Sequence, residues 1–278
     1  MNEINTKKDI IQSFYFNGFI VANIKKSEIH SKFLQTIKKI NINVEKNKYF
    51  RPINRNVFSN TASSLADSTI DQSKYLDFLK KNPVFFEILL ANGIPNLIET
   101  VFGKKLLLRD ISIRKVFKER KLLRQIIKPW GYIGPHRDVY FKKNRWRGAA
   151  PPGCRVFFYP QLSDKDNTEE KMIELYPSSH RKMTNFSNGK FIDFLRSFID
   201  KKYSIIQSNN EIVIMNSATR HSIVKEKNKQ GTMRVLYFFE DPITYKKHNF
   251  KLNEILNEIS FSIKQDSLNT IKNIKNYY

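Results

Sequence analysis

Residues 211–221 carry the sequence EIVIMNSATRH, and residues 231–239 carry GTMRVLYFF. Both contain a run of aliphatic, β-branched or aromatic side chains, which is typical of a strand that is buried on both faces. The first run passes through a short polar turn and ends at His221, and the second holds Arg234 among apolar neighbours. A buried arginine needs an anionic partner, because an unpaired charge away from water is very costly. These two stretches therefore predict a buried β-sheet with a place for an anionic group.

Similar short runs precede these two strands along the chain. They occupy residues 106–108, 111–117, 155–159, 172–175 and 203–206. Turn-rich or charged segments separate them, as in an antiparallel sandwich or barrel. We expect one helix, over residues 189–199, to interrupt this β-rich half of the chain.

The N-terminal third has the pattern of helices. Apolar residues at helical spacing predict a helix over residues 27–40, with Ser27 as its N-cap. Residues 75–101 predict two or three short helices, broken at Pro83 and at residues 93–95. The remaining expectations are a short buried strand at 18–24, a loop over 43–69 and a weakly helical tail over 253–278.

Composition excludes several classes of protein. The 278 residues are 40% hydrophobic and 13% aromatic, enough for a packed core, so the chain is not a disordered basic tail. One cysteine, Cys154, leaves no pair for an internal disulfide and indicates a reducing compartment. The first residues are mostly polar, and the longest apolar runs, such as 84–91, are far shorter than the roughly 20 residues of a membrane span. We therefore expect a cytoplasmic protein without a membrane partner.

The net charge is strongly positive. There are 49 Lys and Arg residues against 26 Asp and Glu residues, which gives a formal net charge of +23. Residues 104–147 hold 15 of the basic residues and 3 of the acidic ones. Such an excess attracts an anionic partner or substrate. The abundance of Lys, Asn and Ile supports a second explanation, since an AT-rich genome would produce the same bias without any function.

A His-x-Asp sequence stands at residues 136–138. Residues i and i+2 of an extended segment point to the same side, so the imidazole of His136 and the carboxylate of Asp138 would be presented together. Two histidines and one carboxylate are the protein ligands of non-haem Fe(II) oxygenases, and His221, 85 residues further on, is the candidate for the second imidazole. Arg234 could take the far carboxylate of a dicarboxylate such as 2-oxoglutarate, with Thr232 as a hydroxyl donor on the same face.

Taken together, these motifs resemble the phytanoyl-CoA dioxygenase family of Fe(II)- and 2-oxoglutarate-dependent oxygenases. Four features match in the family's order: the opening strand FNGFIV at 16–21, the His-x-Asp motif at 136–138, the turn LYPSSH at 175–180, and His221 followed by Arg234. The turn departs from the family's Pro-Gly-Ser-His pattern, because Ser178 stands where glycine is usual. The four features span most of the chain.

The resemblance implies an α+β fold with a double-stranded β-helix, or jelly-roll, core flanked by N-terminal helices. It implies Fe(II) held by His136, Asp138 and His221, 2-oxoglutarate anchored by Arg234, and O₂ as the oxidant that hydroxylates an unactivated C–H bond. The expected substrate is a small anionic metabolite. The single oxygenase domain would comprise a mostly helical part at 1–103, a β-rich catalytic core at 104–245 and a C-terminal helix and tail at 246–278.

Members of the family often supply a second donor for 2-oxoglutarate from the strand before the His-x-Asp motif. Lys115 and Arg114 are the candidates, of which we favour Lys115, and adjacent residues of a strand face opposite sides, so at most one of them points inward. Candidates for binding the substrate are Arg155, Trp130 and Trp146.

Each of these residues also has an ordinary structural explanation. His136 and Asp138 could be a solvated pair, His221 a surface histidine in a turn, and Arg234 the ion-pair partner of Glu240 or Asp241. The family's turn makes His180 a structural residue rather than a ligand, and Cys154 reads as a small buried side chain. For the whole protein, the alternatives are a basic nucleic-acid-binding protein without enzymatic activity and a degenerate family member that binds a ligand without turnover.

Overall fold

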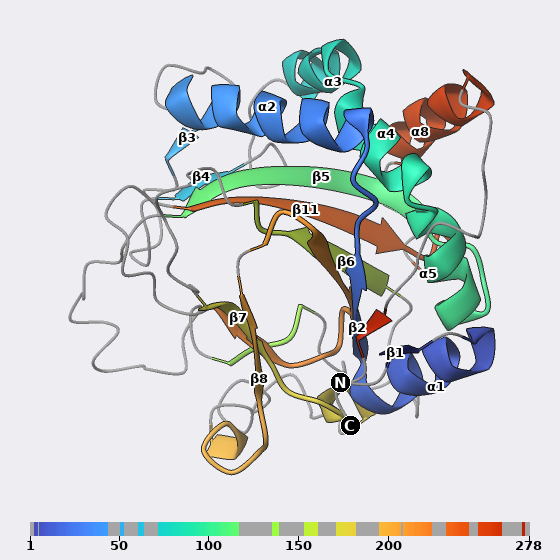
Figure 1. Cartoon of the computed structure of the whole chain (residues 1–278), viewed down its shortest axis with the longest axis vertical. Coiled ribbons are helices and arrows are strands. Elements are labelled where there is room, and N and C mark those ends of the chain that lie inside the picture. Colours follow the sequence, from blue (N-terminus) through green and yellow to red (C-terminus); the bar gives the residue numbers. More distant parts are fainter. Residues whose placement is uncertain are drawn as a thin grey trace.

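Two antiparallel sheets pack against each other, and helices cover the outer face of the larger one (Figure 1). The computed structural model describes residues 3–4, 6–43, 51–52, 61–63, 72–116, 135–138, 153–160, 171–181, 195–206, 208–223, 232–244, 250–262 and 274–275. This arrangement agrees with the predicted double-stranded β-helix flanked by N-terminal helices.

The larger sheet, called sheet A, has nine strands in the described part of the chain. In spatial order they are β1 (Glu3–Ile4), β12 (Ile274–Lys275), β2 (Phe19–Asn23), β9 (Glu211–Asn216), β6 (Gly153–Phe158), β11 (Thr232–Glu240), β5 (Leu107–Val116), β4 (Thr61–Ser63) and β3 (Arg51–Pro52). The smaller sheet, called sheet B, has the order β10 (His221–Ile223), β7 (Lys171–Leu175) and β8 (Tyr203–Ile206). All neighbouring strands are antiparallel.

Strand β6 shows how sheet A separates two layers of core. Val156 and Phe158 belong to the cluster packed under the helices, whereas Phe157 and the following Tyr159 belong to the cluster between the two sheets. Successive side chains of a strand point to opposite faces, and both faces of β6 are buried, so its sequence is almost continuously apolar. Arg155 shares the face of Phe157 and therefore points between the sheets.

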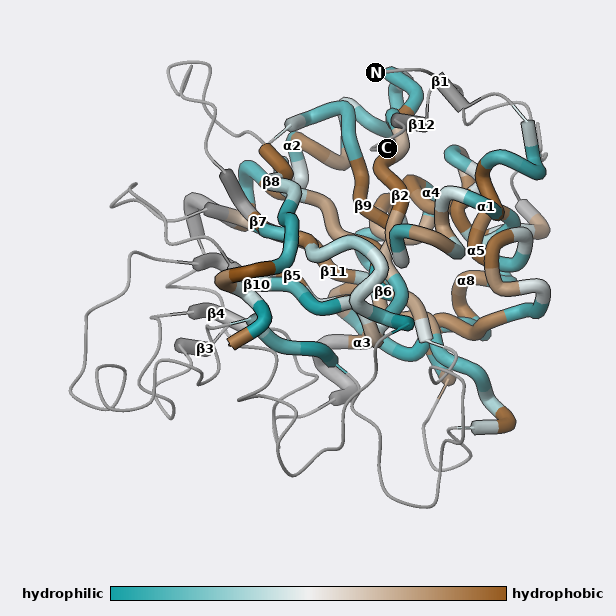
Figure 2. Tube along the Cα trace, turned by 90° about the horizontal axis from the view of Figure 1, so that it is seen from below, coloured by the Kyte–Doolittle hydropathy of each residue, from teal (hydrophilic) through white to brown (hydrophobic). Residues whose placement is uncertain are grey.

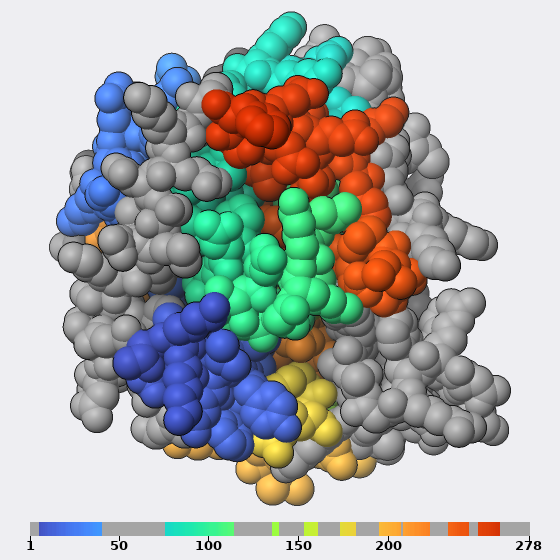
Figure 3. Space-filling model, turned by 90° about the vertical axis from the view of Figure 1, so that its right-hand side faces the viewer, coloured from blue at the N-terminus to red at the C-terminus, as the bar shows by residue number. Residues whose placement is uncertain are grey.

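Helices form the outer layer over sheet A. They are α1 (Lys7–Asn17), α2 (Glu28–Asn43), α3 (Gln72–Lys81), α4 (Val84–Ala91), α5 (Ile94–Phe102) and α8 (Lys251–Ser262). The Phe33 ring of α2 lies 5.0 Å from that of Phe158 in β6 and 5.7 Å from that of Phe85 in α4, so aromatic packing joins two helices to the sheet. Figure 2 shows hydrophobic residues concentrated along β2, β9 and α4, and Figure 3 shows the side of the molecule formed by α1, α5 and α8.

Most of the expected elements are present. Ser27 caps α2, its hydroxyl accepting a hydrogen bond from the His30 N–H at 3.2 Å, and the interruptions at Pro83 and at residues 93–95 separate α3, α4 and α5. The predicted strands 106–108 and 111–117 form one strand, β5, because nine of its residues pair with β11 across a single bulge. The segment 43–69, expected as a loop, contains β3 and β4.

Two further differences concern the C-terminal half. Of the helix expected at 189–199, residues 189–194 lie outside the described residues, and the chain from Leu195 onward makes a short helical turn. The expected weakly helical tail contains α8 and also β12, which pairs with both β1 and β2. A strand of two residues is too short to show a periodic pattern in the sequence. It forms because it pairs with a neighbouring strand of the sheet.

No single helix in the described part of the chain is long and apolar enough to cross a membrane. Helices α4 and α5 together reach the required length and composition, as a pair bent by 57°. Their apolar residues Phe85, Phe86 and Ile98 are buried in the layer between helices and sheet A.

Candidate functional site

His136, Asp138 and His221 meet at one end of the space between the sheets. The backbones of His136 and His221 form an antiparallel bridge, in which each N–H donates to the other's carbonyl at 2.8 Å. The Asp138 N–H donates to the carbonyl of Ser217 at 3.1 Å. One ligand atom from each of the three side chains lies within 4.8 Å of the other two. The structure thus brings together the three residues that the sequence singled out across 85 positions.

A backbone hydrogen bond leaves one ring nitrogen of His221 available as a metal ligand. Its Nδ1 lies 3.0 Å from the carbonyl oxygen of Thr219, which makes Nδ1 the protonated donor and leaves the lone pair on Nε2. Burial, with a smaller contribution from the positive form of His136, lowers the pKa of His221 to about 4 against the opposing effect of Asp138. The imidazole is therefore neutral near pH 7, the form that binds metal ions.

Asp138 is held as an ionised carboxylate. Its Oδ2 lies 2.9 Å from Nε of Arg155, and its Oδ1 lies 3.8 Å from Nε2 of His221. Burial acts to raise the pKa of Asp138, but the positive charge of Arg155 and the nearby imidazoles outweigh it, so that the pKa lies below its usual value. The side chain of Asp138 is 25% exposed and His136 is half-buried, so solvent reaches this His-Asp pair, but Asp138 is ion-paired with Arg155 and the third member of the cluster, His221, is buried.

Arg137, between the two motif residues, has a role that the sequence did not indicate. Its side chain is buried, and Nη1 donates to the carbonyls of Ser179 at 2.5 Å and Ala218 at 2.6 Å. It thereby ties the His-x-Asp segment to the turn after β7 and to the turn before His221. Alternation along an extended segment places the Arg137 side chain opposite those of His136 and Asp138, and nothing in the local sequence indicates its partners.

Two of the four matched motifs and the turn before His221 meet around Gly18. Its carbonyl accepts hydrogen bonds from the Asn216 N–H and the Thr219 hydroxyl, both at 2.8 Å. A Cβ at Gly18 would lie 2.3 Å from Nδ1 of His180 and 2.5 Å from Oγ1 of Thr219, and φ of Gly18 is +81°. Only glycine allows this approach at this backbone conformation.

His180 is a packing residue and not a ligand of the cluster. Its Nε2 donates to the carbonyl of Tyr15 at 2.9 Å, while Nδ1 faces Gly18. Burial is the main cause that lowers the pKa of His180 to about 4. The structural role expected for this histidine therefore agrees with its contacts.

Ser178, at the position where glycine is usual in the turn, has the backbone conformation of a glycine. It has φ of +60°, the left-handed region that glycine adopts most readily. Its hydroxyl donates to the carbonyl of Phe16 at 2.7 Å, and its N–H donates to the carbonyl of Asn17 at 3.1 Å. The serine thus adopts the conformation of a glycine and adds a hydrogen bond to the end of α1.

Known structures share this architecture, although no protein-family model matches the sequence. SnoN, a non-heme alpha-ketoglutarate-dependent epimerase from nogalamycin biosynthesis, aligns with a TM-score of 0.57 and 10% identity over 84% of this chain and 83% of that chain. The chain has the fold of the 2-oxoglutarate-dependent oxygenases. EctD from S. alaskensis, solved with 2-oxoglutarate and 5-hydroxyectoine, has a TM-score of 0.55 and 11% identity over 87% of this chain and 77% of that one. HygX from Streptomyces hygroscopicus, solved with nickel and 2-oxoglutarate bound, has a TM-score of 0.52 and 13% identity over 85% of this chain and 87% of that one.

The oxygenase fold predicted from the sequence motifs is thus confirmed, and the three clustered side chains fit the metal that it implies. Two imidazoles and one carboxylate are the donor set of non-haem iron sites. In this structure one of the imidazoles, that of His221, is neutral with Nε2 available, and the carboxylate of Asp138 is ionised. Deprotonated donors of this kind are what metal binding requires.

Arg234 lies on the inner face of this fold. Its neighbours Met233 and Val235 belong to the cluster under the helices, and Leu236 belongs to the cluster between the sheets, so alternation places Arg234 between the sheets. The side chain is buried. Glu240 lies six residues along the same strand, about 20 Å away at the rise of a strand, which argues against the simple ion pair at the strand end.

The remaining sequence-predicted residues are placed only by backbone register or lie outside the described residues. Thr232 is the first residue of β11 and is paired with Val116. Lys115 is paired with Met233, which packs under the helices, and Arg114 is paired with Arg234. Trp130 and Trp146 lie outside the described residues.

Arg155 has partners within the protein at all three guanidinium nitrogens. Nε contacts Asp138, Nη1 donates to the carbonyl of Cys154 at 3.2 Å, and Nη2 lies 3.6 Å from Oε1 of Glu240. It faces the space between the sheets, and its role in binding a substrate stays a prediction. Cys154 is buried, and burial raises the pKa of its thiol, so it is a packing residue.

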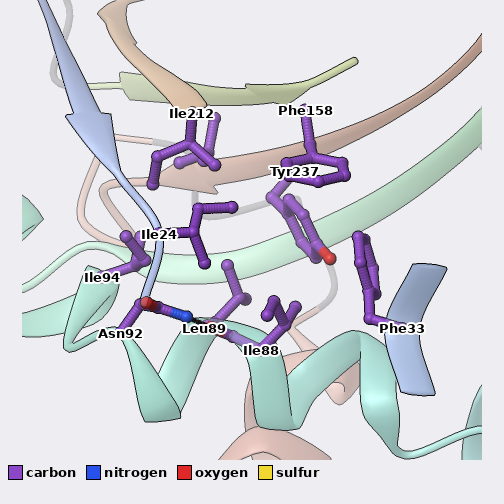
Figure 4. A pocket seen from close by; sticks show the side chains of 10 residues that line it. Ile24, Phe33, Ile88, Leu89, Asn92, Ile94, Phe158, Ile212 and Tyr237 are labelled. Atoms are coloured by element: carbon purple, nitrogen blue, oxygen red, sulfur yellow. Dashed lines mark hydrogen bonds between the residues drawn. The ribbon is translucent and has the colours of Figure 1, made fainter. Parts of the chain in front are cut away.

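A small pocket lies on the opposite, helix-covered face of sheet A (Figure 4). Its lining includes Ile24, Phe33, Leu89, Phe158, Ile212 and Tyr237. The lining is almost entirely apolar, and the Tyr237 hydroxyl has no hydrogen-bond partner among the described residues. Its lining belongs to the cluster packed under the helices, so sheet A separates this pocket from the three clustered side chains.

Proposed function

We propose that this protein is an Fe(II)- and 2-oxoglutarate-dependent oxygenase that hydroxylates a C–H bond of a small anionic molecule. The observation that carries the proposal is the cluster of His136, Asp138 and His221, whose ligand atoms lie within 4.8 Å of one another. The cluster stands at one end of the space between the two sheets, in a chain whose fold is shared with enzymes such as SnoN and EctD.

The ion would supply the oxidising chemistry when it is bound with 2-oxoglutarate and O₂, in a reaction that yields succinate, CO₂ and the hydroxylated product. The protein supplies the ligands and their orientation. The Thr219 carbonyl fixes the tautomer of His221, and Arg155 keeps Asp138 ionised and oriented. Arg137 holds the two ligand-bearing segments together through two backbone carbonyls.

Arg234 is our proposed anchor for the far carboxylate of 2-oxoglutarate. Its support is burial on the inner face of β11, where an anion that enters the space between the sheets would meet a guanidinium shielded from water. Thr232 is a further proposed donor, as is either Lys115 or Arg114. Of these two, the register pairs Arg114 with Arg234.

The small anionic substrate is supported by the charge of the chain. The segment 104–147, which contains His136 and Asp138, holds 15 basic residues against 3 acidic ones. A basic surface near a site raises the local concentration of anions. One of the solved structures with this fold is that of an epimerase. We propose hydroxylation, and the chemical identity of the product distinguishes it from epimerisation.

The proposal is tested with protein purified without oxygen and loaded with Fe(II) and 2-oxoglutarate. We expect a weak visible charge-transfer band from the loaded site, and succinate formation once O₂ is admitted. The His136→Ala variant should lose both signals, whereas Lys202→Gln, which alters the exposed ion pair with Glu174, should keep them. A wild-type protein with no band and no succinate, indistinguishable from His136→Ala, would rule the function out. Binding of arbitrary oligonucleotides with steep salt dependence would instead favour the nucleic-acid-binding alternative.

A further inference from the structure

Resting on the function proposed above, we propose that Arg155 is a positioning residue. It fixes the carboxylate of Asp138 so that one oxygen, Oδ1, is left for the metal. A carboxylate can bind a metal through one oxygen or through both, and a ligand with a hydrogen-bonded second oxygen is restricted to the first mode. The distances around Asp138 match this restriction, because Oδ2 faces Arg155 Nε at 2.9 Å and Oδ1 faces His221 Nε2 at 3.8 Å.

Arg155 is attached to the centre of the larger sheet. It stands on β6, the middle strand of sheet A, where it is paired with Met215 of β9 on one side and with Phe238 of β11 on the other. Asp138 belongs to the segment 135–138, whose described backbone contacts are the bridge to His221 and one hydrogen bond to Ser217. The ion pair therefore connects the side chain of a loop residue directly to the centre of the sheet.

A second carboxylate keeps Arg155 in place from the other side. Glu240 directs Oε1 toward Arg155 Nη2 at 3.6 Å and Oε2 toward Arg109 Nε at 3.0 Å. We call Asp138, Arg155, Glu240 and Arg109 the ion chain. Its charges alternate, so Arg155 remains paired with Glu240 when the charge of Asp138 is shared with a metal ion, and no buried charge is left without a partner.

One aromatic ring supports both arginines of the ion chain. The guanidinium carbon of Arg155 lies 4.5 Å from the ring centroid of Phe238, and that of Arg109 lies 5.4 Å from it. Cation–π contact restricts the plane of each guanidinium group. Arg109 thus contacts the same aromatic ring and the same carboxylate, Glu240, as Arg155 does. Its ion pair in the ion chain is with Glu240, whereas Arg155 also contacts Asp138. This makes Arg109 a matched control.

The test measures Co(II) binding to the purified full chain, because the visible absorption of bound Co(II) reports the number and type of its ligands. We expect Arg155→Gln to weaken Co(II) binding by about 10–100-fold and to change the shape of the Co(II) absorption, since the released Oδ2 of Asp138 becomes free to join the metal. Arg109→Gln, which removes a contact of Glu240 and none of Asp138, should weaken Co(II) binding less than Arg155→Gln does and keep the wild-type absorption. Thermal unfolding of each metal-free variant records whether it is folded.

The double variant Arg155→Gln/Glu240→Gln covers the case in which Arg155→Gln does not fold because Glu240 loses a partner. It carries no buried charge at either position, and we expect it to keep the weakened affinity and the altered absorption. Wild-type Co(II) binding by Arg155→Gln or by the double variant would overturn the inference, as would equal losses in Arg155→Gln and Arg109→Gln. A wild-type protein that binds no Co(II) would instead remove the proposed function, on which the inference rests.

Discussion

Replacing Gly18 by alanine should lower the free energy of unfolding by about 2–5 kcal/mol. The backbone conformation, with φ of +81°, costs a residue with a Cβ about 1–2 kcal/mol. The added methyl group would also stand 2.3 Å from His180 Nδ1 and 2.5 Å from Thr219 Oγ1, and forcing extra atoms into a packed site costs about 1–3 kcal/mol. The sum of these two contributions is the expected loss.

Equilibrium unfolding in urea measures the effect, with Gly103→Ala as the matched control. Gly103 also has a positive φ, +65°, but a Cβ there would meet nothing within 4 Å. Its replacement should therefore show the conformational contribution alone, about 1–2 kcal/mol. The difference between the two variants isolates the steric contribution at Gly18. Equal losses at the two glycines would refute the reasoning.

The same variant should affect the candidate site. Thr219, which the new methyl group would displace, supplies the carbonyl that accepts the hydrogen bond from His221 Nδ1. We expect Gly18→Ala to bind Co(II) more weakly, while Gly103→Ala binds it as the wild type does. Unchanged binding in Gly18→Ala, together with the expected loss of stability, would show that the packing around Gly18 supports the fold and does not set the orientation of His221.

Three other variants give independent measurements. Ser178→Gly should change the free energy of unfolding by no more than about 1 kcal/mol, because relief of the positive φ offsets the lost hydrogen bond to Phe16. Ser178→Val should lower the free energy of unfolding by at least about 1–2 kcal/mol, because valine is strained at this φ. Equal effects of the two substitutions would contradict the conformational argument. Tyr237→Phe should raise the free energy of unfolding by about 1 kcal/mol, since it removes a buried hydroxyl without a partner among the described residues, and a clear loss would reveal a partner. His180 stays neutral when folded, with a pKa of about 4 against 6.5 when exposed, so only the unfolded chain gains a proton as the pH falls between these values. Stability contributed by His180 is therefore complete above pH 6.5 and declines toward pH 4, by up to about 3 kcal/mol, and His180→Asn should show a correspondingly smaller decline.

The sequence predicts the parts of the molecule that have their own local pattern. Pro83 and the glycine at position 93 separate the short helices as expected, and the apolar runs at 211–215 and 233–239 form parts of strands β9 and β11. His136, Asp138 and His221 could be identified because the three residue types form a known donor set in a fixed order along the chain. The cluster observed in the structure has these three members.

The remaining features depend on contacts between distant residues. Arg137 is held by the carbonyl of Ala218, 81 residues away, and no local pattern announces such a contact. Strand β10 consists of three residues and exists because His221 pairs with Leu175 of β7. The partners of Arg155 could not be foreseen either. The pairing of β6 with β11 brings it near Glu240, and the fold of a distant segment brings it near Asp138.

Among the described residues, sheet A ends at both edges in very short strands. β1 and β12, at one edge, are two residues each, and β4 and β3, at the other, are three and two residues, the last of these containing Pro52. A long flat edge exposes a row of unpaired N–H and C=O groups to which another polypeptide can add a strand, which leads to aggregation. Short outer strands offer few such groups, and a proline offers one donor fewer. The strands that carry Arg155 and Arg234 are thus kept away from edge-to-edge association between molecules.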